Sequence, residues 1–213
     1  KKKKKNPPVG WRLVHIIHFF PAYLLITMAK LQYDEQKILA MVQNPLQREA
    51  GFRMIMAHFG RTIYWHIRRM VVSHEDAQDA LQETSINIWQ GLEKFNADSA
   101  ISTWVYRIAT NEALRVLRRR TFIFQSVDAL GDELVEKLEA DPDIDAQSTE
   151  AIFQKAVLKL PTQQRLAFNL RYYDELPYEE IAKITGKNVS TLKTNYHLAV
   201  TKLKSILTNE TID

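Results

Sequence analysis

The segment Ile101–Arg120 has the periodicity of an α-helix with two chemically different faces. Apolar residues recur every three or four positions on one face, as in a helix that packs on a core. They are Val105, Tyr106, Ala109, Ala113, Val116 and Leu117. The other face carries Trp104, Arg107, Asn111, Arg115 and Arg118. Ser102 is a candidate N-cap, so we expect a helix that buries one side only.

The polar face of this helix allows two interpretations. Arginines and an asparagine in a row can contact phosphates and base edges, and a tryptophan can stack on a base. The same residues can also form a solvated basic face whose tryptophan packs against a neighbouring helix, since aromatic side chains are usually largely buried. This segment alone leaves both interpretations open.

The residues before this helix predict further helices. Asp34–Val42 is a short helical candidate that the Asn44-Pro45 pair ends, because a residue before proline avoids the α region. A longer apolar periodicity covers 45–72, and a third covers Asp76–Leu92 with acidic residues in its first turn. A short polar loop, Phe95–Ile101, leads into the opening helix. We therefore predict an all-α fold whose first domain, residues 28–120, is a three- or four-helix bundle.

Residues 121–149 differ in composition from the rest of the chain. Lys137 is their single basic residue, against eight acidic ones: Asp128, Asp132, Glu133, Glu136, Glu139, Asp141, Asp143 and Asp145. Proline at 142 excludes a regular helix through that point. The composition predicts an acidic, partly disordered linker between two domains, with a loop that merely solvates itself as the alternative.

The second domain, residues 150–209, contains a helix-turn-helix pattern. Pro177 suits the first turn of a helix, Gly186 suits a sharp turn, and Asn188 is a good N-cap for the next helix. The exposed start of that next helix carries Ser190, Thr191, Lys193, Thr194, Asn195 and Leu198. Such residues reach base edges in the major groove of DNA. A helical hairpin with no DNA role is the alternative.

Composition argues against the common enzyme classes. The chain has no cysteine, which excludes disulfides, thiolate metal sites and cysteine nucleophiles and suits a reducing cytosol. Its six histidines form no metal-ligand pattern, and no glycine-rich phosphate loop is present. We expect no cofactor, no metal, no small-molecule substrate and no enzymatic activity. The adjacent Glu179 and Glu180, or Glu83, are the weak candidates for a hydrolase, because no nucleophile accompanies them.

The first 27 residues differ from everything after them. They carry six basic residues and no acidic one, so the rest of the chain has a negative net charge although the total is +4. We expect Met28 to be the natural start and residues 1–27 to be a non-native or disordered extension. A membrane-associated or cleaved head and a genuine ordered extension are the alternatives. The apolar run 14–26 is too short to span a bilayer.

Three segments in this order resemble a bacterial RNA polymerase sigma factor of the sigma-70 family, extracytoplasmic-function (ECF) type. DAQDALQETSINIW (76–89) is similar to region 2.2, and FNADSAISTWVYRIATNEALRVLRRR (95–120) to regions 2.3 and 2.4. Residues 160–207 resemble region 4. The resemblance covers about residues 35–207. It implies a transcription initiation factor that binds core polymerase through the β′ clamp helices and the β flap and acts on promoter DNA. An anti-sigma factor would be a further candidate partner, and the linker would lie in the RNA channel.

The resemblance also implies residue roles. Asp76, Asp79, Gln82 and Glu83 would contact core polymerase. The −10 element would be opened and read by Phe95, Asn96, Ser99, Ser102, Trp104, Arg107, Asn111, Arg115 and Arg118. The −35 element would be read by Lys187, Ser190, Thr191, Lys193, Thr194 and Asn195.

Two departures from the family pattern qualify these roles. Ala80 and Ser85 stand where the family usually has Leu and Phe, and Thr194-Asn195-Tyr196 replaces the common Ser-Arg-Leu. The lost arginine removes a contact worth about 1–3 kcal/mol of base discrimination. A stand-alone helix-turn-helix regulator that binds duplex DNA as a dimer is the alternative function, but it leaves residues 76–89 without a role.

Overall fold

The regular structure of the chain is helical wherever it is described. The computed structural model describes residues 33–124, 127–141, 144–145 and 147–209, and the expectations for residues 1–27 lie outside this part. The helices are α3 (Glu35–Gln43), α4 (Arg48–Val71), α5 (His74–Gly91), the short 3₁₀ helix η2 (Leu92–Lys94), α6 (Ile101–Phe124), α7 (Val127–Glu139), α8 (Thr149–Leu158), α9 (Thr162–Tyr172), α10 (Tyr178–Thr185) and α11 (Val189–Asn209). The all-α prediction is confirmed.

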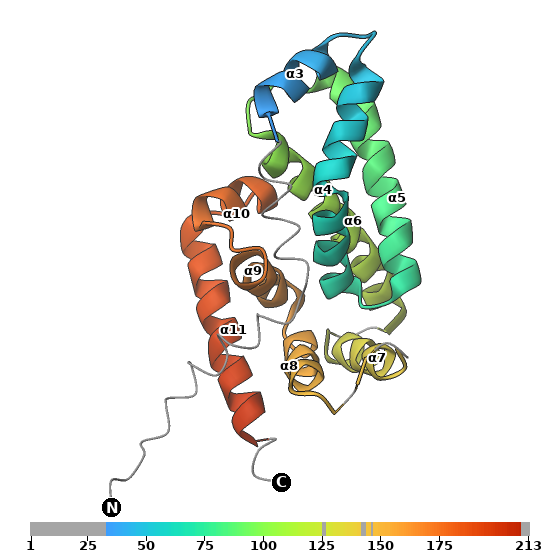
Figure 1. Cartoon of the computed structure of the whole chain (residues 1–213). Helices are drawn as coiled ribbons and strands as arrows, with labels where there is room; N and C mark the ends of the chain where they lie inside the picture. Colours follow the sequence, from blue (N-terminus) through green and yellow to red (C-terminus); the bar gives the residue numbers. More distant parts are fainter. Residues whose placement is uncertain (1–32, 125–126, 142–143, 146, 210–213) are drawn as a thin grey trace, which may run out of the picture. The chain divides into compact units, whose positions relative to one another are not determined.

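Helices α4, α5 and α6 lie side by side and share one apolar core (Figure 1). Ile55, Ile63 and Ile67 of α4 are fully buried, and the predicted apolar face of α6 is buried as well, apart from a half-buried Val116. The turn before α5 is closed by Ser73, whose side chain accepts a hydrogen bond from the Asp76 backbone N–H at 3.3 Å.

The start of α6 corrects one expectation. The helix begins at Ile101, so Ser102 lies inside it and is not the N-cap. The free Ile101 N–H donates instead to Glu35 Oε1 of α3, at 2.7 Å. A carboxylate at this position also complements the positive end of the helix dipole. The cap therefore comes from a residue 66 positions away in sequence.

Most of the described part of residues 121–149 is helical, which corrects the expectation that this acidic segment is partly disordered. Residues 121–124 continue α6, and α7 forms a regular helix from Val127 to Glu139. Leu130, Leu134 and Leu138, spaced four apart, are buried, and the helix packs against α6 and α8. The four-residue spacing of these leucines outweighs the acidic composition, because it provides an apolar stripe that the neighbouring helices cover.

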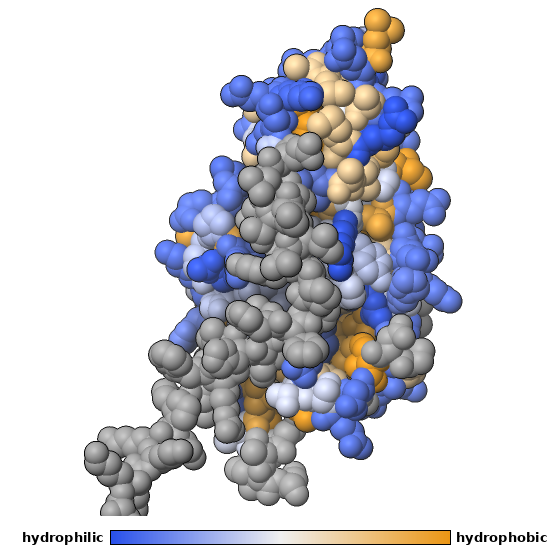
Figure 2. Space-filling model, viewed as in Figure 1, coloured by the Kyte–Doolittle hydropathy of each residue, from blue (hydrophilic) through white to orange (hydrophobic). Residues whose placement is uncertain are grey.

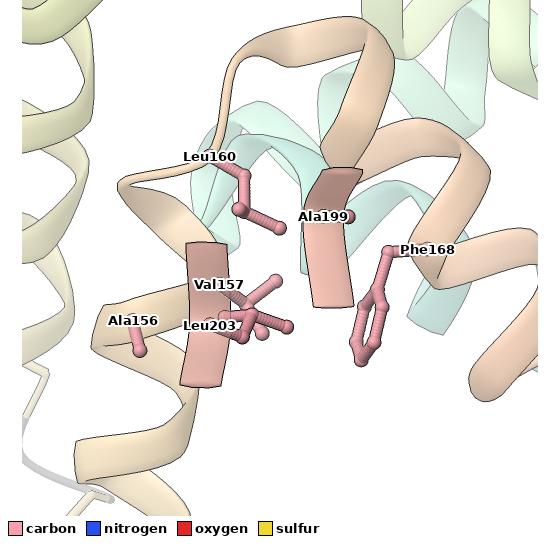
Figure 3. Packing of buried hydrophobic residues seen from close by; sticks show 6 residues of the cluster. All are labelled: Ala156, Val157, Leu160, Phe168, Ala199 and Leu203. Carbon is pink, nitrogen blue, oxygen red and sulfur yellow. The ribbon is translucent and has the colours of Figure 1, made fainter. Parts of the chain in front are cut away.

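Helices α8, α9 and α11 form a second apolar cluster. Figure 3 shows how Val157 of α8, Phe168 of α9 and Leu203 of α11 point toward one another, with Ala156, Leu160 and Ala199 completing the cluster. The small Ala199 sits fully buried on α11, where a larger side chain would hold its neighbours apart. Phe168 also stacks on Tyr172 and Tyr196, with ring centroids 5.0 and 5.9 Å apart. These contacts hold α11 in a fixed orientation on α9.

Two general findings limit the chemistry of the described part of the chain. Its helices lack the combination of length and apolarity that is needed to cross a membrane. Among the same residues, His, Asp and Glu side chains do not gather into a group of three or more that could hold a metal ion.

Candidate nucleic-acid interface

The polar face of α6 is partly open and partly paired. Arg107, Asn111 and Arg118 are exposed. Arg115 is not free, because its guanidinium donates to Glu112 at 2.6 Å and lies 3.6 Å from Glu83 on α5. Glu83 was expected to contact polymerase and Arg115 to contact DNA, and the structure brings the two together as an ion pair across α5 and α6.

Trp104 packs on the end of α5 and on the loop that precedes α6. A Cβ atom added to Gly91 would lie 2.8 Å from the Trp104 ring, so the ring rests directly on the glycine. Its other neighbour is Phe95, with ring centroids 4.7 Å apart and planes tilted by 33°. Both aromatic residues remain half-buried. The structure therefore joins Phe95 and Trp104 into an aromatic surface beside the polar face.

The loop between η2 and α6 presents small polar groups next to this aromatic surface. Asn96 is exposed and donates to Asp98 at 2.6 Å. Ser99 and Ser102 are half-buried. Ala97 has a φ of 62°, in the left-handed region that non-glycine residues seldom adopt. This backbone turns the loop sharply between Phe95 and the start of α6.

One edge of the α6 polar face contacts α10. Thr103 Oγ1 donates to Glu180 Oε2 at 2.6 Å, and Arg107 donates twice to the Lys183 backbone oxygen, at 3.0 and 2.6 Å. Hydrogen bonds from Lys183 and then from Thr103 lower the pKa of Glu180. Asn111 lines a shallow pocket beside Lys183 and Gly186. Sequence reasoning missed Thr103, and its place next to the polar face of the helix was the available signal.

The turn of the helix-turn-helix forms as predicted. Gly186 has a φ of 69°, and Asn188 Oδ1 accepts the Thr191 N–H at 2.7 Å, capping α11. The residues expected to read DNA follow at once. Ser190, Thr191, Lys193 and Thr194 are exposed, and Lys187 and Asn195 are half-buried. The Lys193 ammonium lies 5.7 Å from the centre of the Tyr178 ring of α10.

Four residues of α5 were expected to contact core polymerase, and three of them lie on its outer face. Asp79, Gln82 and Glu83 are exposed. Asp76 instead pairs with Arg120, which also binds Glu133 of α7 at 2.9 Å. Sequence reasoning missed the apolar part of this face, Ile86 and Trp89, which are 41% and 43% exposed. Both lie off the buried stripe of α5, and that offset was the signal that could have found them.

Hydrophilic side chains dominate the face of the molecule drawn in Figure 2, and hydrophobic residues form separate patches on it. An extended polar surface with local apolar patches is compatible with binding to nucleic acid and to protein. The geometry thus leaves exposed polar residues on two helices, α6 and α11, and gives a third helix, α5, an exposed face that combines acidic, polar and apolar residues.

Comparisons with known proteins identify the two helical parts. Residues 55–123 match the family model "Sigma-70 region 2", and residues 150–203 match "Sigma-70, region 4". The chain is 32% identical over 171 residues to the RNA polymerase sigma-H factor of Pseudomonas aeruginosa, which covers 76% of this chain and 88% of the relative. The chain belongs to the sigma-70 family. It is an ECF-type sigma factor, which directs RNA polymerase to promoters through regions 2 and 4 and is not itself an enzyme.

Further relatives and solved structures agree with this assignment. The ECF sigma factor SigW of Bacillus subtilis is 30% identical over 156 residues, covering 69% of this chain and 83% of that protein. The fold is similar to that of RpoE from Bartonella quintana, solved with the anti-sigma factor NepR, at a TM-score of 0.57 and 21% identity over 74% of this chain and 96% of RpoE. It is also similar to CnrH, solved with the cytosolic domain of CnrY, at a TM-score of 0.59 and 21% identity, covering 82% and 97% of the two chains.

Proposed function

We propose that this sigma factor reads the two promoter elements with two different helices. The start of α11 enters the major groove of the −35 element. The aromatic surface of Phe95 and Trp104, with the polar face of α6, holds unpaired bases and the backbone of the −10 element. The observation that carries this proposal is the shared placement of the aromatic pair, the polar loop and the exposed Arg107 and Asn111 at the start of α6.

The chemistry of the α6 surface suits a separated strand better than a duplex. Extruding a base costs a few kcal/mol, which stacking on an aromatic side chain, worth about 1–3 kcal/mol per base, can offset. The aromatic pair provides such a stacking surface, and Asn96, Ser99 and Ser102 offer hydrogen bonds beside it. Arg107, Asn111 and Arg118 continue along the helix, where they can contact the phosphates of the same strand.

The −35 specificity is expected to differ from that of better-known family members. Asn195 stands where the family's common arginine would offer a bidentate contact to guanine. Asparagine instead favours adenine, through its N6 and N7 atoms. Lys187 and Lys193 supply phosphate contacts, which fix the position of the helix without selecting a sequence.

The exposed face of α5 is the proposed contact with core polymerase. Asp79, Gln82 and Glu83 supply polar contacts to the β′ clamp helices, and Ile86 and Trp89 supply apolar area beside them. Region 4 is the proposed partner of the β flap. The structural relative RpoE, which was solved with the anti-sigma factor NepR, supports an anti-sigma factor as a further partner. The factor is expected to act in the cytoplasm, where polymerase and DNA meet.

Transcription with purified core polymerase tests the −10 assignment. Arg107→Ala and Asn111→Ala are expected to reduce promoter opening, measured by permanganate reactivity of unpaired thymines, while core polymerase binding stays unchanged. The promoter is first selected from genomic fragments by run-off transcription with the unmodified protein. Arg53→Ala is the matched control, because Arg53 is an arginine on α4 whose side chain is 71% exposed and which lies outside the proposed surface.

Two results would contradict this assignment. Absence of promoter-dependent product with any genomic fragment would count against the promoter-reading role as a whole. Loss of core polymerase binding in Arg107→Ala would give α6 a structural role instead. For α11, Lys193→Ala should weaken binding to all sequences alike and reduce its salt dependence, whereas Asn195→Ala should relax specificity at one base pair.

A further inference from the structure

Asp174, in the loop between α9 and α10, connects the region 4 helices to the region 2 helices. Its carboxylate is 2% exposed. Arg69 of α4 donates to Oδ1 at 2.5 Å, and His66 Nδ1 of α4 lies 2.9 Å from Oδ2. Both partners lie more than 100 positions away in sequence. A carboxylate in such a place must keep these partners, because an unpaired buried charge is very costly.

The surroundings of Asp174 fix both partners. His66 is fully buried, and its Nε2 lies 3.0 Å from Thr110 Oγ1 of α6. The Arg69 guanidinium lies 5.0 Å from the centre of the Tyr173 ring. Burial and then the charge of Asp174 raise the pKa of Tyr106, which keeps this phenol protonated. One carboxylate thus links α4, α6 and the loop before α10.

The loop itself is shaped to hold Asp174 at this position. The Asp174 N–H donates to the Asn169 backbone oxygen at 3.1 Å, and the Leu176 N–H donates to the Leu170 oxygen at 3.0 Å. Glu175, between them, has a φ of 54°, a conformation that is strained for a non-glycine residue. The backbone therefore turns just after Asp174.

The contact held by Asp174 places α10 against the proposed −10 surface. Thr103 is bonded to Glu180, and both guanidinium donors of Arg107 that face α10 are used by the Lys183 carbonyl. The oxygen of Lys183 lies at the C-terminal end of α10, where the helix dipole favours a cation. Arg107 cannot direct the same two donors to a phosphate at the same time.

The interface around Asp174 is polar and incompletely satisfied, as expected of a contact that opens. Among the described residues, Arg69 Nε and Asn169 Oδ1 are buried without a hydrogen-bond partner. The Asn169 amide group donates only to the sulfur of Met70, at 3.4 Å. Native cores rarely leave such groups unpaired, whereas interfaces between domains that move are more polar than cores.

We propose that Asp174 is the latch of an autoinhibited conformation, in which α10 occupies the −10 surface until promoter binding or polymerase binding releases it. The proposal rests on the function proposed for Arg107. Releasing the latch exposes Thr103, frees the two Arg107 donors that the Lys183 oxygen occupies, and frees α10 for the −35 element. Apparent affinity for DNA is then reduced by the fraction of molecules that are closed.

Distances between spin labels in the full-length protein test the latch. The chain has no cysteine, so labels at Gln90→Cys on α5 and Lys202→Cys on α11, both exposed positions, attach without competition. Asp174→Asn removes the charge and keeps the shape. It is expected to raise the ratio of open to closed molecules about tenfold or more. Glu175→Gln, the exposed neighbour, is the matched control and should leave the distances unchanged.

A second pair of variants keeps the test decisive if Asp174→Asn fails to fold by circular dichroism. Glu180→Ala removes the acceptor of Thr103, while Glu179→Ala removes an exposed carboxylate from the same first turn of α10. Only the former should shift the distances toward the open population. Unchanged distances in both Asp174→Asn and Glu180→Ala overturn the latch, and so does an equal opening in either control.

Binding of fluorescein-labelled dT20 distinguishes the latch from the proposed −10 role. The open variant should bind this strand more tightly than the unmodified protein, by a factor set by the change in open fraction. Adding Arg107→Ala to it should abolish the gain. If the distances open and the gain persists without Arg107, the latch stands and the proposed role of Arg107 is wrong.

Discussion

Helix α7 offers a direct test of whether the acidic segment is an ordered part of the protein. Leu134, at its centre, is fully buried, and Leu130 and Leu138 flank it on the same face. Leu134→Ala removes apolar volume at the middle of this stripe. It does not weaken the helix itself, because alanine has the highest helix propensity. Glu136→Ala is the matched control, because Glu136 is exposed on the same helix.

The magnitude follows from the burial. Replacing a buried leucine by alanine costs about 2–5 kcal/mol, depending on how far the site collapses. Helix α7 is short and packs mainly against α6 and α8, so collapse is easy and the lower part of this range, about 2–3 kcal/mol, is expected. The ion pairs of Arg120 and Lys137 with Glu133 remain in the variant. Because these pairs are present in both proteins, they cancel in the comparison of the variant with the unmodified protein.

Amide hydrogen exchange resolved along the chain measures this effect, because α7 can detach without global unfolding. A loss of about 2 kcal/mol corresponds to roughly thirtyfold faster exchange in α7, with α4 and α9 little changed. Exchange rates in Leu134→Ala equal to those in Glu136→Ala would refute the reasoning and restore the flexible tether that the composition suggested.

Three further predictions follow from local geometry. Gly91→Ala should destabilise the protein by about 1 kcal/mol or more, because the new Cβ meets Trp104 at 2.8 Å. In Gly60→Ala the new Cβ meets its nearest side chain at 3.9 Å, so the free energy of unfolding in urea should rise by about 0.5–1 kcal/mol. Equal changes in the two variants would contradict a clash at Gly91. Asn188→Ala should cost about 1 kcal/mol of thermal stability through the lost cap, and Ser205→Ala on the same helix should cost nothing comparable. Burial raises the pKa of Tyr106, so the folded state retains a proton that the unfolded state loses near pH 10, and stability should fall as pH rises above about 10. Tyr106→Phe should flatten this decline of the unfolding free energy with pH. An unchanged slope would show that other groups cause the decline.

The parts of the fold that sequence predicted are those determined by neighbours along the chain. Gly186 and Asn188 specify a left-handed turn and a cap through their own chemistry. The leucines of α7 carry the same kind of local signal, because their four-residue spacing indicates an apolar stripe, whereas the acidic composition of the segment indicates a tether. The spacing was the better guide, because Glu133 pairs with Arg120 and Lys137 and so does not repel the helix from its neighbours.

For the candidate site, the sequence predicted which residues share a helix face and not how those residues are arranged. Periodicity separates the two faces of α6, yet it does not show that Trp104 rests on Gly91 or that Arg115 pairs with Glu83. Those outcomes depend on how α5 lies against α6. The hydrogen bond between Asp174 and Arg69 joins residues 105 positions apart. The sequence around either residue therefore does not predict it.

The different chemistry of the two contacts implies an order of events in opening. The Lys183 carbonyl that Arg107 binds is neutral, and a phosphate offers the same donors a full negative charge, so DNA replaces this contact with a stronger one. Asp174 has no such substitute, because its partners Arg69 and His66 lie on α4 and are covered, away from the proposed strand path. Strand binding therefore replaces the hydrogen bonds that Arg107 loses. It does not offset the free energy needed to break the Asp174 contact. Under the proposed latch, polymerase binding at the proposed contacts on α5 and region 4 supplies that free energy by holding the two regions apart. The free factor is then expected to bind DNA weakly and the holoenzyme strongly.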